Sequence, residues 1–323
     1  MTVGVETIVD GLHRLDVPLG DRFVSLYLAV GDTSALLFDT GTNGMIPQQV
    51  LPALAQVGVD PRDVRSVVVS HCDVDHFGGV ADAREAFPQA QLAAHALERP
   101  AIEDYGTYLS TRARGFVEAY GWDEDRAVLD WCRSVTRETP LDSDLVDGQI
   151  IDLGGREAII RHVPGHSRGH LAVDLPWASA ILVSDAVLGS SVNTVDGTPA
   201  FPPTYRFVDD YLATINTIEA LDRRMLLTAH YPTFEGERAR EFLAESRAFV
   251  ERLDALVVSS ITESPQTLAE LLAVLNPSAG DWPEVGTQGA LAFPVVGHLE
   301  RMLERGQAKS AGTRDGIPLW SAA

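Results

Sequence analysis

The sequence predicts an α/β fold built in layers, and two observations lead to that prediction. Up to residue 94, short apolar runs with strand-like alternation take turns with segments whose apolar residues recur at helical spacing. In addition, a histidine or an aspartate follows five of the predicted strands, where α/β folds gather their functional loops. The 323 residues are enough for one large core and a smaller appended unit.

The N-terminal part of the chain contains the clearest alternation. Alternating apolar residues predict a hairpin formed by residues 23–30 and 35–38. A helix is expected at 45–57, where Gly58 ends it. The elements predicted next are a strand at 66–69, a helix at 80–87 and a strand at 91–94.

Residues 97–147 interrupt this alternation with an aromatic and acidic segment of helical composition, which carries 12 acidic and 6 basic residues. An insertion between two core strands commonly becomes a lid or a wall of the functional site. We therefore expect a helical lid here, in which the aromatic residues form the lid's own core more often than a surface for substrate. Strands resume afterwards, and the further predicted elements are strands at 149–153, 158–163, 170–175, 180–183 and 225–229 and helices at 207–221 and 236–257.

The C-terminal segment has a different character. Ser264-Pro265 opens a helix that is expected to end at Leu275, and a connector rich in proline and glycine follows at 276–287. A second helix is predicted at 290–304, before a short two-stranded tail. Helix, helix and hairpin together are the outline of a winged helix. The predicted division is therefore a catalytic domain at 1–257 and a winged-helix-like unit at 258–323.

Charge and composition exclude several classes of function. The net charge of −21 repels the phosphate backbone of nucleic acids, and residues 258–323 carry 7 acidic and 4 basic residues, the wrong sign for an RNA-binding unit. No stretch approaches the roughly 20 apolar residues that span a bilayer, and the N-terminus has no secretion signal, so the expected location is the cytoplasm, with no membrane partner. The two cysteines are expected to stay reduced there.

The segment "SHCDVDHFGG" at residues 70–79 concentrates groups that could bind a metal ion. It places two histidines and two aspartates within six residues, directly after an apolar strand. Other candidates follow other strands: Asp39 follows "LLF", His166 follows "IIRHVPG", Asp185 follows "ILVS" and His230 follows "LLTA". Because functional loops gather at one edge of such a sheet, we expect these side chains to converge.

Together these motifs resemble those of the metallo-β-lactamase superfamily, over roughly residues 5–235. The matching motifs are "FDTG" at Asp39, the H-x-H-x-D-H block at residues 71–76, "PGHS" at His166, "SDA" at Asp185 and "AHYP" at His230. All five occur in order and with ordinary spacing. The resemblance implies a four-layer αββα sandwich, into which the helical insertion and the winged-helix-like unit are added.

The resemblance also implies a centre of two divalent metal ions. The ligands it implies are His71, Asp73 and His166 at the first site and Asp75, His76 and His230 at the second. Asp185 would bridge the two ions, Asp39 would support the ligand loops, and Asp75 is in addition expected to take part in catalysis. Zinc is the expected metal, with iron or manganese as alternatives. Two ions about 3.5 to 4 Å apart can share a hydroxide, which is available near neutral pH because a bound metal lowers the pKa of water to about 7.

Asp73 departs from the family pattern, because a histidine is usual at its position. Its carboxylate adds a negative charge and hardens the first site, which favours iron or manganese. A carboxylate, usually glutamate, also stands here in the flavodiiron oxygen reductases of the same superfamily, so a di-iron redox enzyme stays open. Alternatively, Asp73 points to solvent and only the second site holds an ion.

Two further residues near the motifs need an interpretation. His170 in "GHSRGH" is either a group that supports the site or substrate, or a residue with a purely structural hydrogen bond. Cys72 lies between candidate ligands, but the alternation of side chains predicts that it points away from them. His13, His95, His162 and His298 are assigned no function.

The predicted function is hydrolysis of a small-molecule ester-type carbonyl, with a thioester favoured. A thiolate leaves with a conjugate-acid pKa of about 8.5, whereas a leaving amine must be protonated, and the sequence offers no obvious extra acid. The alternatives are a lactonase, a β-lactamase-like hydrolase, a phosphodiesterase or nuclease, and the di-iron redox enzyme. The expected partner is a small-molecule substrate; a homodimer stays open, because a wing-like tail can pack against a second subunit.

Overall fold

The computed structural model describes residues 4–323, except for the side chains of residues 284–288. Two β-sheets form its centre, and the first has seven strands in the order of the chain. Strands β1 to β4 pair antiparallel, whereas β4 to β7 pair parallel. The bounds of the seven strands are Gly4–Val9 (β1), Leu12–Leu19 (β2), Arg22–Val30 (β3), Ala35–Phe38 (β4), Val64–Val68 (β5), Gln91–His95 (β6) and Ser143–Leu145 (β7).

The second sheet has six strands in the order β15-β14-β11-β10-β9-β8. Only β11 and β14 pair parallel in it. Its strands are Ile150–Asp152 (β8), Glu157–His162 (β9), Leu171–Leu175 (β10), Ala180–Ser184 (β11), Met225–Thr228 (β14) and Phe234–Glu235 (β15). A separate two-stranded ribbon pairs Val192–Asn193 (β12) with Pro199–Phe201 (β13).

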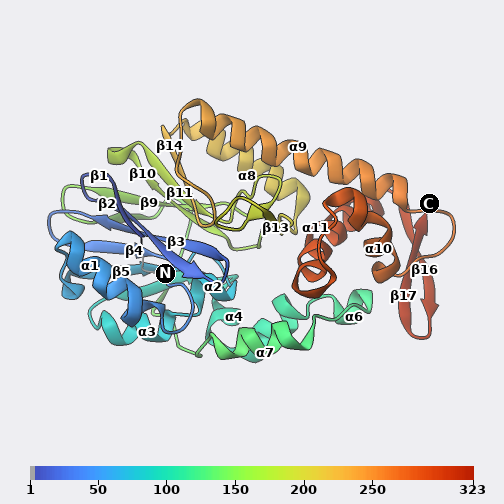
Figure 1. Cartoon of the computed structure of the whole chain (residues 1–323), viewed down its shortest axis with the longest axis horizontal. Coiled ribbons are helices and arrows are strands. Elements are labelled where there is room, and N and C mark those ends of the chain that lie inside the picture. The colour runs from blue at the N-terminus through green and yellow to red at the C-terminus, as the bar shows by residue number, and fades with distance from the viewer. Residues whose placement is uncertain (1–3) are drawn as a thin grey trace.

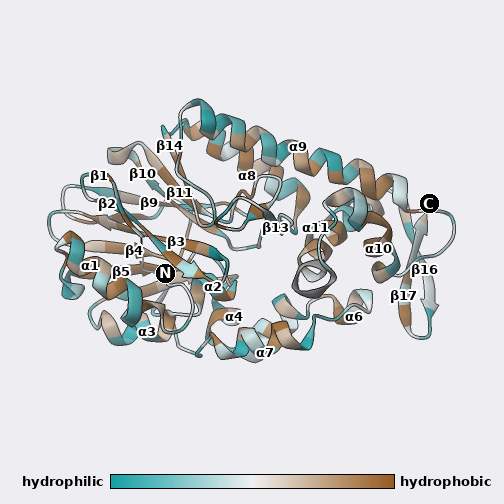
Figure 2. Cartoon of the chain, viewed as in Figure 1, coloured by the Kyte–Doolittle hydropathy of each residue, from teal (hydrophilic) through white to brown (hydrophobic). Residues whose placement is uncertain are grey.

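Helices cover the outer faces of both sheets, which gives the predicted four-layer αββα arrangement (Figure 1). The first sheet carries η1 (Ile46–Val50), α1 (Leu51–Val57), α2 (Val74–Phe77) and α3 (Val80–Ala86). The second carries α8 (Val208–Leu221) and α9 (Glu237–Ser260). Between the sheets, fully buried side chains such as Tyr27, Phe38, Val173 and Leu227 form one hydrophobic cluster. Figure 2 shows hydrophobic residues in the strands of both sheets.

Sequence patterns account well for these elements. The predicted hairpin corresponds to β3 and β4, and the predicted helix at 45–57 corresponds to η1 and α1. Gly58 ends α1 as predicted, because its φ of 73° lies in the left-handed region that glycine adopts without strain. The sequence analysis did not identify strands β1 and β2, which extend the first sheet at one edge.

The insertion is helical, as predicted, over most of its length. Its helices are Arg99–Glu103 (α4), Tyr105–Tyr108 (α5), Leu109–Ala113 (η3, a turn of π-helix), Val117–Tyr120 (α6) and Arg126–Ser134 (α7). Its last part is not helical, because β7 joins the first sheet beside β6. Phe116 and Tyr120 pack against Phe293 and Trp320 of the C-terminal segment, with ring centroids 4.9 and 5.5 Å apart. The lid is therefore attached to the C-terminal segment as well as to the sheet.

The C-terminal segment consists of Leu268–Ala279 (α10), Glu284–Glu304 (α11) and a hairpin of Ala308–Arg314 (β16) and Ile317–Ala322 (β17). This order agrees with the predicted helix, helix and hairpin, and the winged-helix assignment itself stays a prediction. The predicted connector at 276–287 is wrong at both ends, because α10 continues through Pro277 and α11 begins at Glu284. The side chain of Asn276 bonds both backbone groups of the buried Trp282, at 2.9 and 2.7 Å, and so closes a shorter turn.

This segment shares its core with the rest of the chain. One cluster joins Ile215 of α8 and Phe249 of α9 to Leu272 of α10 and Leu299 of α11. Helix α9 extends from the second sheet to the C-terminal helices (Figure 1) and ends at Ser260, just past the predicted domain boundary. Among the described residues, no helix is both long and apolar enough to cross a membrane.

Candidate metal centre

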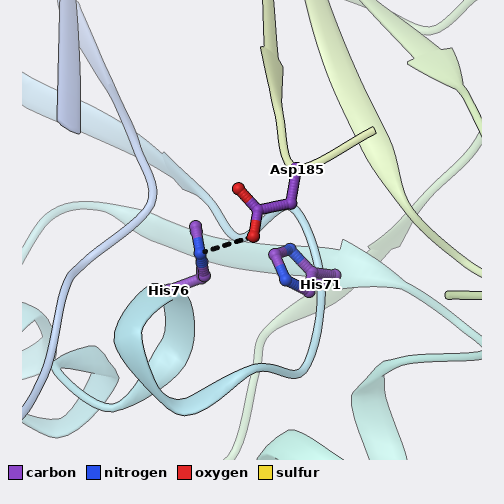
Figure 3. Close-up of side chains that lie close together, drawn as sticks. All are labelled: His71, His76 and Asp185. Atoms are coloured by element: carbon purple, nitrogen blue, oxygen red, sulfur yellow. Dashed lines mark ion pairs between the residues drawn. The ribbon is translucent and has the colours of Figure 1, made fainter. Parts of the chain in front are cut away.

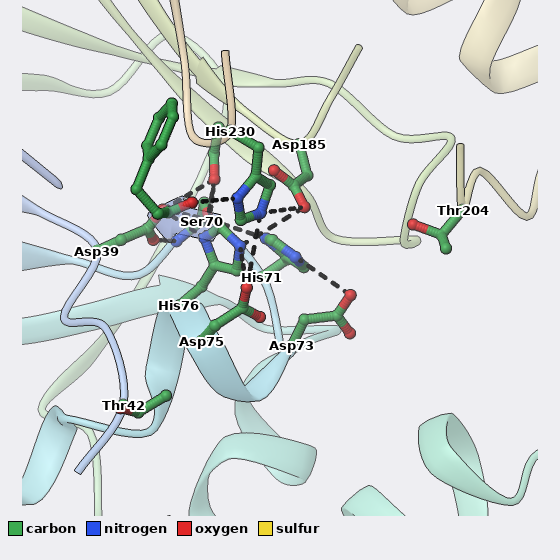
Figure 4. Close-up of polar contacts among 12 residues, drawn as sticks. Asp39, Thr42, Ser70, His71, Asp73, Asp75, His76, Asp185, Thr204 and His230 are labelled. Atoms are coloured by element: carbon green, nitrogen blue, oxygen red, sulfur yellow. Dashed lines mark hydrogen bonds and ion pairs between the residues drawn. The ribbon is translucent and has the colours of Figure 1, made fainter. Parts of the chain in front are cut away.

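The predicted ligands and Asp39 come together at the edge where strands of both sheets end; Figure 4 labels Asp39 and all of these ligands except His166, which lies beside Asp73. The first sheet supplies Asp39 after β4 and the 71–76 segment after β5. The second sheet supplies His166 between β9 and β10, Asp185 after β11 and His230 after β14. Three overlapping groups of these side chains have donor atoms within 4.8 Å of one another: His71, His76 and Asp185; His71, Asp73 and His166; and Asp75, His76 and His230.

The glycine pair in "DHFGG" has a steric role in this arrangement. Asp73 ends the extended segment, and the single turn of α2 then carries Asp75 and His76. A Cβ atom on Gly79 would lie 2.4 Å from the carbonyl oxygen of Thr40, and one on Gly78 would lie equally close to backbone oxygens. Only glycine lets the loop after β4 approach the ligand helix so closely.

The second site, formed by Asp75, His76, His230 and Asp185, has contacts of roughly the length found around a tetrahedral metal ion. His76 Nε2 and His230 Nε2 lie 3.5 and 3.4 Å from Asp185 Oδ2. The same two nitrogens lie 3.7 and 3.5 Å from Asp75 Oδ2. Donor atoms held about 2.0 to 2.2 Å from one tetrahedral ion are roughly 3.3 to 3.6 Å apart. The four carboxylate–imidazole contacts therefore have close to the spacing expected around one divalent ion.

Several donor atoms here have no partner within the described protein, although they are buried. These atoms are His71 Nε2, His76 Nε2 and Asp185 Oδ1. Figure 3 shows the two histidines and Asp185 facing one another, with an ion pair drawn between His76 and Asp185. Buried polar groups almost always have a partner, so this cluster of orphaned atoms is the arrangement expected of residues that share a cation.

The other ring nitrogen of each histidine is held by a neighbour. His230 Nδ1 donates to the carbonyl oxygen of Phe23 at 2.9 Å, and His76 Nδ1 lies 3.0 Å from Asp39 Oδ2. His71 Nδ1 lies 2.8 Å from Ser70 Oγ, and His166 Nδ1 lies 3.3 Å from the Thr204 hydroxyl. Because each Nδ1 is engaged, each Nε2 is the atom directed at the centre.

Asp39 contacts the loops that carry His71, His76 and Asp185, and its role as a support for metal ligands stays a prediction. Its Oδ1 accepts from the backbone N–H of Ser70 at 2.7 Å, and its Oδ2 accepts from the hydroxyls of Ser70 and Ser184 at 2.9 and 2.8 Å. Together with its contact to His76, the carboxylate links both sheets beneath the centre. Asp39 has a φ of 65°, a left-handed conformation in which aspartate and asparagine are tolerated better than most side chains.

The first site, formed by His71, Asp73 and His166, differs from the second because a guanidinium forms hydrogen bonds with its side chains. Arg112 of η3 donates from Nε to Asp73 Oδ1 at 2.5 Å and from Nη2 to Asp73 Oδ2 at 2.6 Å. Arg112 Nη2 also lies 3.0 Å from His166 Nε2, which in turn lies 3.0 Å from Asp73 Oδ2. Asp73 thus faces the lid and His166 in an ion pair, and it does not point into solvent. The sequence analysis missed Arg112, since nothing in residues 97–147 marks it out from the other arginines.

Charge at the centre is strongly negative, and the pKa values reflect this. Burial alone would lower the pKa of His76, but the nearby carboxylates, Asp75, Asp185 and Asp39, raise it well above its usual value. Burial and the neighbouring His76 and His166 lower the pKa of His71 to about 3. A metal ion would neutralise the same carboxylates that raise the pKa of His76. The charge balance and the orphaned donors therefore both fit a bound cation.

A buried glutamate, also missed from the sequence, connects two ligand loops. Glu98 lies just beyond β6 and is 2% exposed. Its carboxylate accepts from the backbone N–H of Cys72 at 3.0 Å and of Gly169 at 2.6 Å. Glu98 thereby fixes the loop of His71 to the loop of His166. No sequence signal points to this role, because it depends on two loops that are distant along the chain.

The remaining candidates take the following places. The side chain of Cys72 belongs to the hydrophobic cluster on the outer face of the first sheet, away from the donor groups, as predicted. The ring of His170 stacks on that of His71 at 4.6 Å, and neither of its nitrogens has a hydrogen-bond partner within the described protein. The structural hydrogen bond considered for His170 is therefore not observed. His298 lies far along the chain in α11, bonded to Tyr205 and Asp254.

A pocket of about 420 Å³ opens beside the donor groups. Asp73, Asp75 and Arg112 line it, as do the polar residues Arg22, Glu124 and Thr204, and most of its remaining wall is apolar. The lid supplies much of that wall, and further lining comes from β13 and α11; the apolar side chains include Tyr108, Ala113, Ala127, Val128, Trp131, Phe201, Ala290 and Phe293. A second cavity of about 450 Å³ lies on the other side of Arg112 and Phe293, which line both spaces.

Residues 19–230 match the sequence profile of the Metallo-beta-lactamase superfamily. The chain belongs to this superfamily. The resemblance seen in the motifs is thereby confirmed, and so is the sandwich fold. Membership implies divalent metal ions, and the donor groups of the chain fit them; which metal they hold is not fixed by the fold.

Curated relatives include several hydrolases. The acyl-coenzyme A thioesterase MBLAC2 of Gallus gallus is 28% identical over 227 residues, which cover 68% of this chain and 76% of that protein. The human protein of the same name matches over 57% of its length, at 28% identity. A probable metallo-hydrolase of Mycobacterium tuberculosis is 31% identical, with coverage of 50% of this chain and 51% of the relative. The chain thus spans between half and three quarters of these proteins.

Solved structures show the same fold over nearly the whole chain. A beta-lactamase domain protein from Burkholderia ambifaria has a TM-score of 0.73 at 19% identity and covers 99% of this chain and 95% of its own. A metallo-beta-lactamase family protein from Thermus thermophilus has a TM-score of 0.70 at 22% identity, with coverage of 98% and 100%. These similarities extend across the C-terminal segment, so the fold of that segment also occurs in other proteins.

Proposed function

We propose that the protein is a metal-dependent hydrolase that cleaves acyl thioesters. The observation that carries the proposal is the mostly apolar pocket of about 420 Å³ that Asp73, Asp75 and Arg112 help to line. A pocket of this kind accommodates an acyl chain and places its carbonyl carbon at the donor groups. Relatives named as thioesterases, from Gallus gallus and, at 21% identity, from Aspergillus fumigatus, support the same substrate class.

In the proposed mechanism, residues of the chain bind the metal ion, orient the attacking water and accept its proton. Asp75, His76, His230 and Asp185 would hold one divalent ion, and His71, Asp73 and His166 are the candidate ligands for a second. When bound, a divalent ion supplies a hydroxide near neutral pH and polarises the carbonyl oxygen. Asp75 is the candidate residue to orient the attacking water and accept its proton.

The leaving group explains why a thioester suits this site. After attack, the thiolate departs without needing a proton, since its conjugate acid has a pKa of about 8.5. Among the ionisable groups at the candidate metal centre, Arg112 stays charged, and both Asp73 and Asp185 have pKa values well below their usual range, so none of these three readily protonates a leaving amine. For Asp73, burial opposes this shift, and the Arg112 charge outweighs it. An amide or β-lactam would therefore be cleaved less readily.

The test is a panel of acyl thioesters of increasing chain length, together with a lactone, a β-lactam and a phosphodiester. We expect thioesters to be cleaved with the highest kcat/KM, and longer chains to be preferred until the pocket is filled. Ala127→Trp fills the pocket from α7 and should shift the preference to shorter chains by ~10-fold or more in kcat/KM.

The matched control is Ala119→Trp, which adds the same side chain to an exposed position of the lid that does not line the pocket. Its chain-length profile should equal that of the unchanged protein. A higher kcat/KM for the lactone, β-lactam or phosphodiester than for every thioester would refute the proposed substrate class. An unchanged chain-length profile in Ala127→Trp would show that the acyl chain does not bind in this pocket.

A further inference from the structure

We propose that Arg112 is a resident cation of the first metal site, and that it limits the protein to one tightly bound metal ion. In this view the ion is held by Asp75, His76, His230 and Asp185, and a second ion binds only by displacing the guanidinium. The inference rests on the metal binding of the proposed function and is independent of the thioester substrate.

The first step of the argument is geometric. Arg112 forms a two-pronged ion pair with Asp73, at 2.5 and 2.6 Å, which is the strongest geometry for an arginine and a carboxylate. An ion at the first site would have to take Asp73 Oδ2 from this guanidinium, and the Nε2 atom of His166 as well, since Arg112 Nη2 lies 3.0 Å from it.

A comparison of the two donor groups supports this competition. In the second site, His76 Nε2 has no hydrogen-bond partner among the described residues. The distances between histidine nitrogens and carboxylate oxygens there are 3.4 to 3.7 Å, close to those around a tetrahedral ion. In the first site, His71 Nε2 also has no hydrogen-bond partner in the described chain and lies 3.5 Å from Asp73 Oδ2, but His166 Nε2 is only 3.0 Å from the same oxygen, a hydrogen-bond distance. A neutral His166 either donates to Asp73 or accepts from Arg112 through this atom, and in both cases the atom is engaged.

Burial makes the ion pair costly to break. The side chain of Arg112 is 10% exposed and that of Asp73 is 24% exposed. In the described part of the chain, Arg112 pairs with no other carboxylate and Asp73 with no other arginine. Removing one member of a buried pair leaves the other as an uncompensated charge. A metal ion can therefore replace the guanidinium only if Arg112 finds a new position.

The surroundings hold Arg112 where it is. Its guanidinium lies 4.3 Å from the centre of the Phe293 ring, in a cation–π contact. Its backbone belongs to the π-helical turn η3, within the lid. Ring, lid and carboxylate together fix the guanidinium, and the number of bound ions becomes linked to the position of the lid.

Charge explains why an aspartate and an arginine occur together. Asp73 stands where a neutral histidine is usual in the superfamily, so it adds one negative charge, and Arg112 adds the matching positive charge from the lid. The pair leaves the net charge of the centre as it would be with a histidine. It also supplies a fixed cation beside the substrate pocket, which both residues line.

The test compares the unchanged protein with Arg112→Gln and with Arg114→Gln. Arg114 is the matched control, because it lies two residues away in the lid and pairs with Asp123 in an exposed ion pair. Each protein is stripped with a chelator, titrated with Zn²⁺ against a coloured competing chelator, and analysed for zinc after desalting. We expect one tightly bound ion in the unchanged protein and in Arg114→Gln. In Arg112→Gln we expect a second ion, bound at least ~10-fold more tightly than in the unchanged protein.

Other outcomes are equally decisive. Two tightly bound ions in the unchanged protein, or a zinc content in Arg112→Gln equal to or below that of Arg114→Gln, would overturn the inference. If Arg112→Gln does not fold, Arg112→Met keeps the apolar stem beside Phe293 and removes the charge, and the same expectations apply. Absence of bound zinc from every protein would refute the proposed metal-dependent function as well, whereas two ions in every protein would refute only the role of Arg112.

Discussion

At the scale of single residues, each candidate ligand depends on a neighbour that orients it. Four histidines present Nε2 to the centre because Ser70, Asp39, Thr204 and the carbonyl oxygen of Phe23 contact the other ring nitrogen. Of these neighbours, Asp39 contacts the most groups and carries a charge. A substitution there tests how far orientation, as distinct from ligation, determines metal affinity.

We expect Asp39→Asn to lower metal affinity by roughly 10 to 100-fold, the usual effect of losing such a support. Asparagine tolerates the left-handed backbone, so the change removes the charge and one of the two acceptor oxygens without adding backbone strain. Competition with a chelator measures the affinity. The control is Asp32→Asn at an exposed turn. Equal affinities in the two variants would show that Asp39 does not orient the ligands.

At the scale of elements, Glu300 of α11 connects three parts of the chain. It accepts from Tyr120 of the lid at 2.6 Å and from two nitrogens of Arg206, which precedes α8, at 2.7 and 2.5 Å. Burial would raise the pKa of Glu300, but the hydrogen bonds and charge of Arg206 outweigh it, so the pKa is lowered. The ionised carboxylate therefore connects the lid, which lines the apolar pocket, to α11 and to the segment before α8.

We expect Glu300→Gln to reduce the free energy of unfolding by roughly 1 kcal/mol at pH 7, a modest value because the side chain is 39% exposed. A lowered folded-state pKa means that the stabilisation is fully present above the unfolded-state pKa of about 4.3. It is lost as pH falls through the folded-state pKa, so the two proteins should converge in acid. Urea unfolding between pH 7 and 3 measures this, and exposed Glu304→Gln is the control. A difference that stays constant with pH would contradict the expectation.

At the scale of the whole molecule, the net charge of −21 acts on any charged substrate. A polyanionic thioester, such as one with a phosphorylated thiol carrier, is repelled at low ionic strength, and salt screens the repulsion over about 10 Å at 0.1 M. The kcat/KM for such a substrate should rise with added salt, while that for an uncharged thioester should not change. Steady-state assays over a salt series measure both. A fall for the anionic substrate would contradict the expected repulsion and would point to local attraction, for instance by the arginines Arg112, Arg168 and Arg206 that line the second cavity.

How much of this could be predicted from the sequence depended on distance along the chain. The 71–76 segment and the strand ends that carry Asp39, Asp185 and His230 could be identified because each motif is local and the topology brings them together. Arg112 and Glu98 could not, because their roles arise from packing of the lid against loops far away in sequence. The end of α10 was wrong for a different reason: the prolines and glycine at 276–287 predicted a loop, whereas the helix continues through Pro277 to Ala279.

The origin of the pocket walls has a consequence for how such a protein can change over generations. The candidate ligands all follow strands of the two sheets, whereas most of the apolar lining, and Arg112, come from the lid and from α11. Mutations in the lining can therefore alter which molecule the pocket accepts while the candidate ligands stay unchanged. Arg112 is the exception, since a mutation in the lid at this one position reaches the chemistry directly.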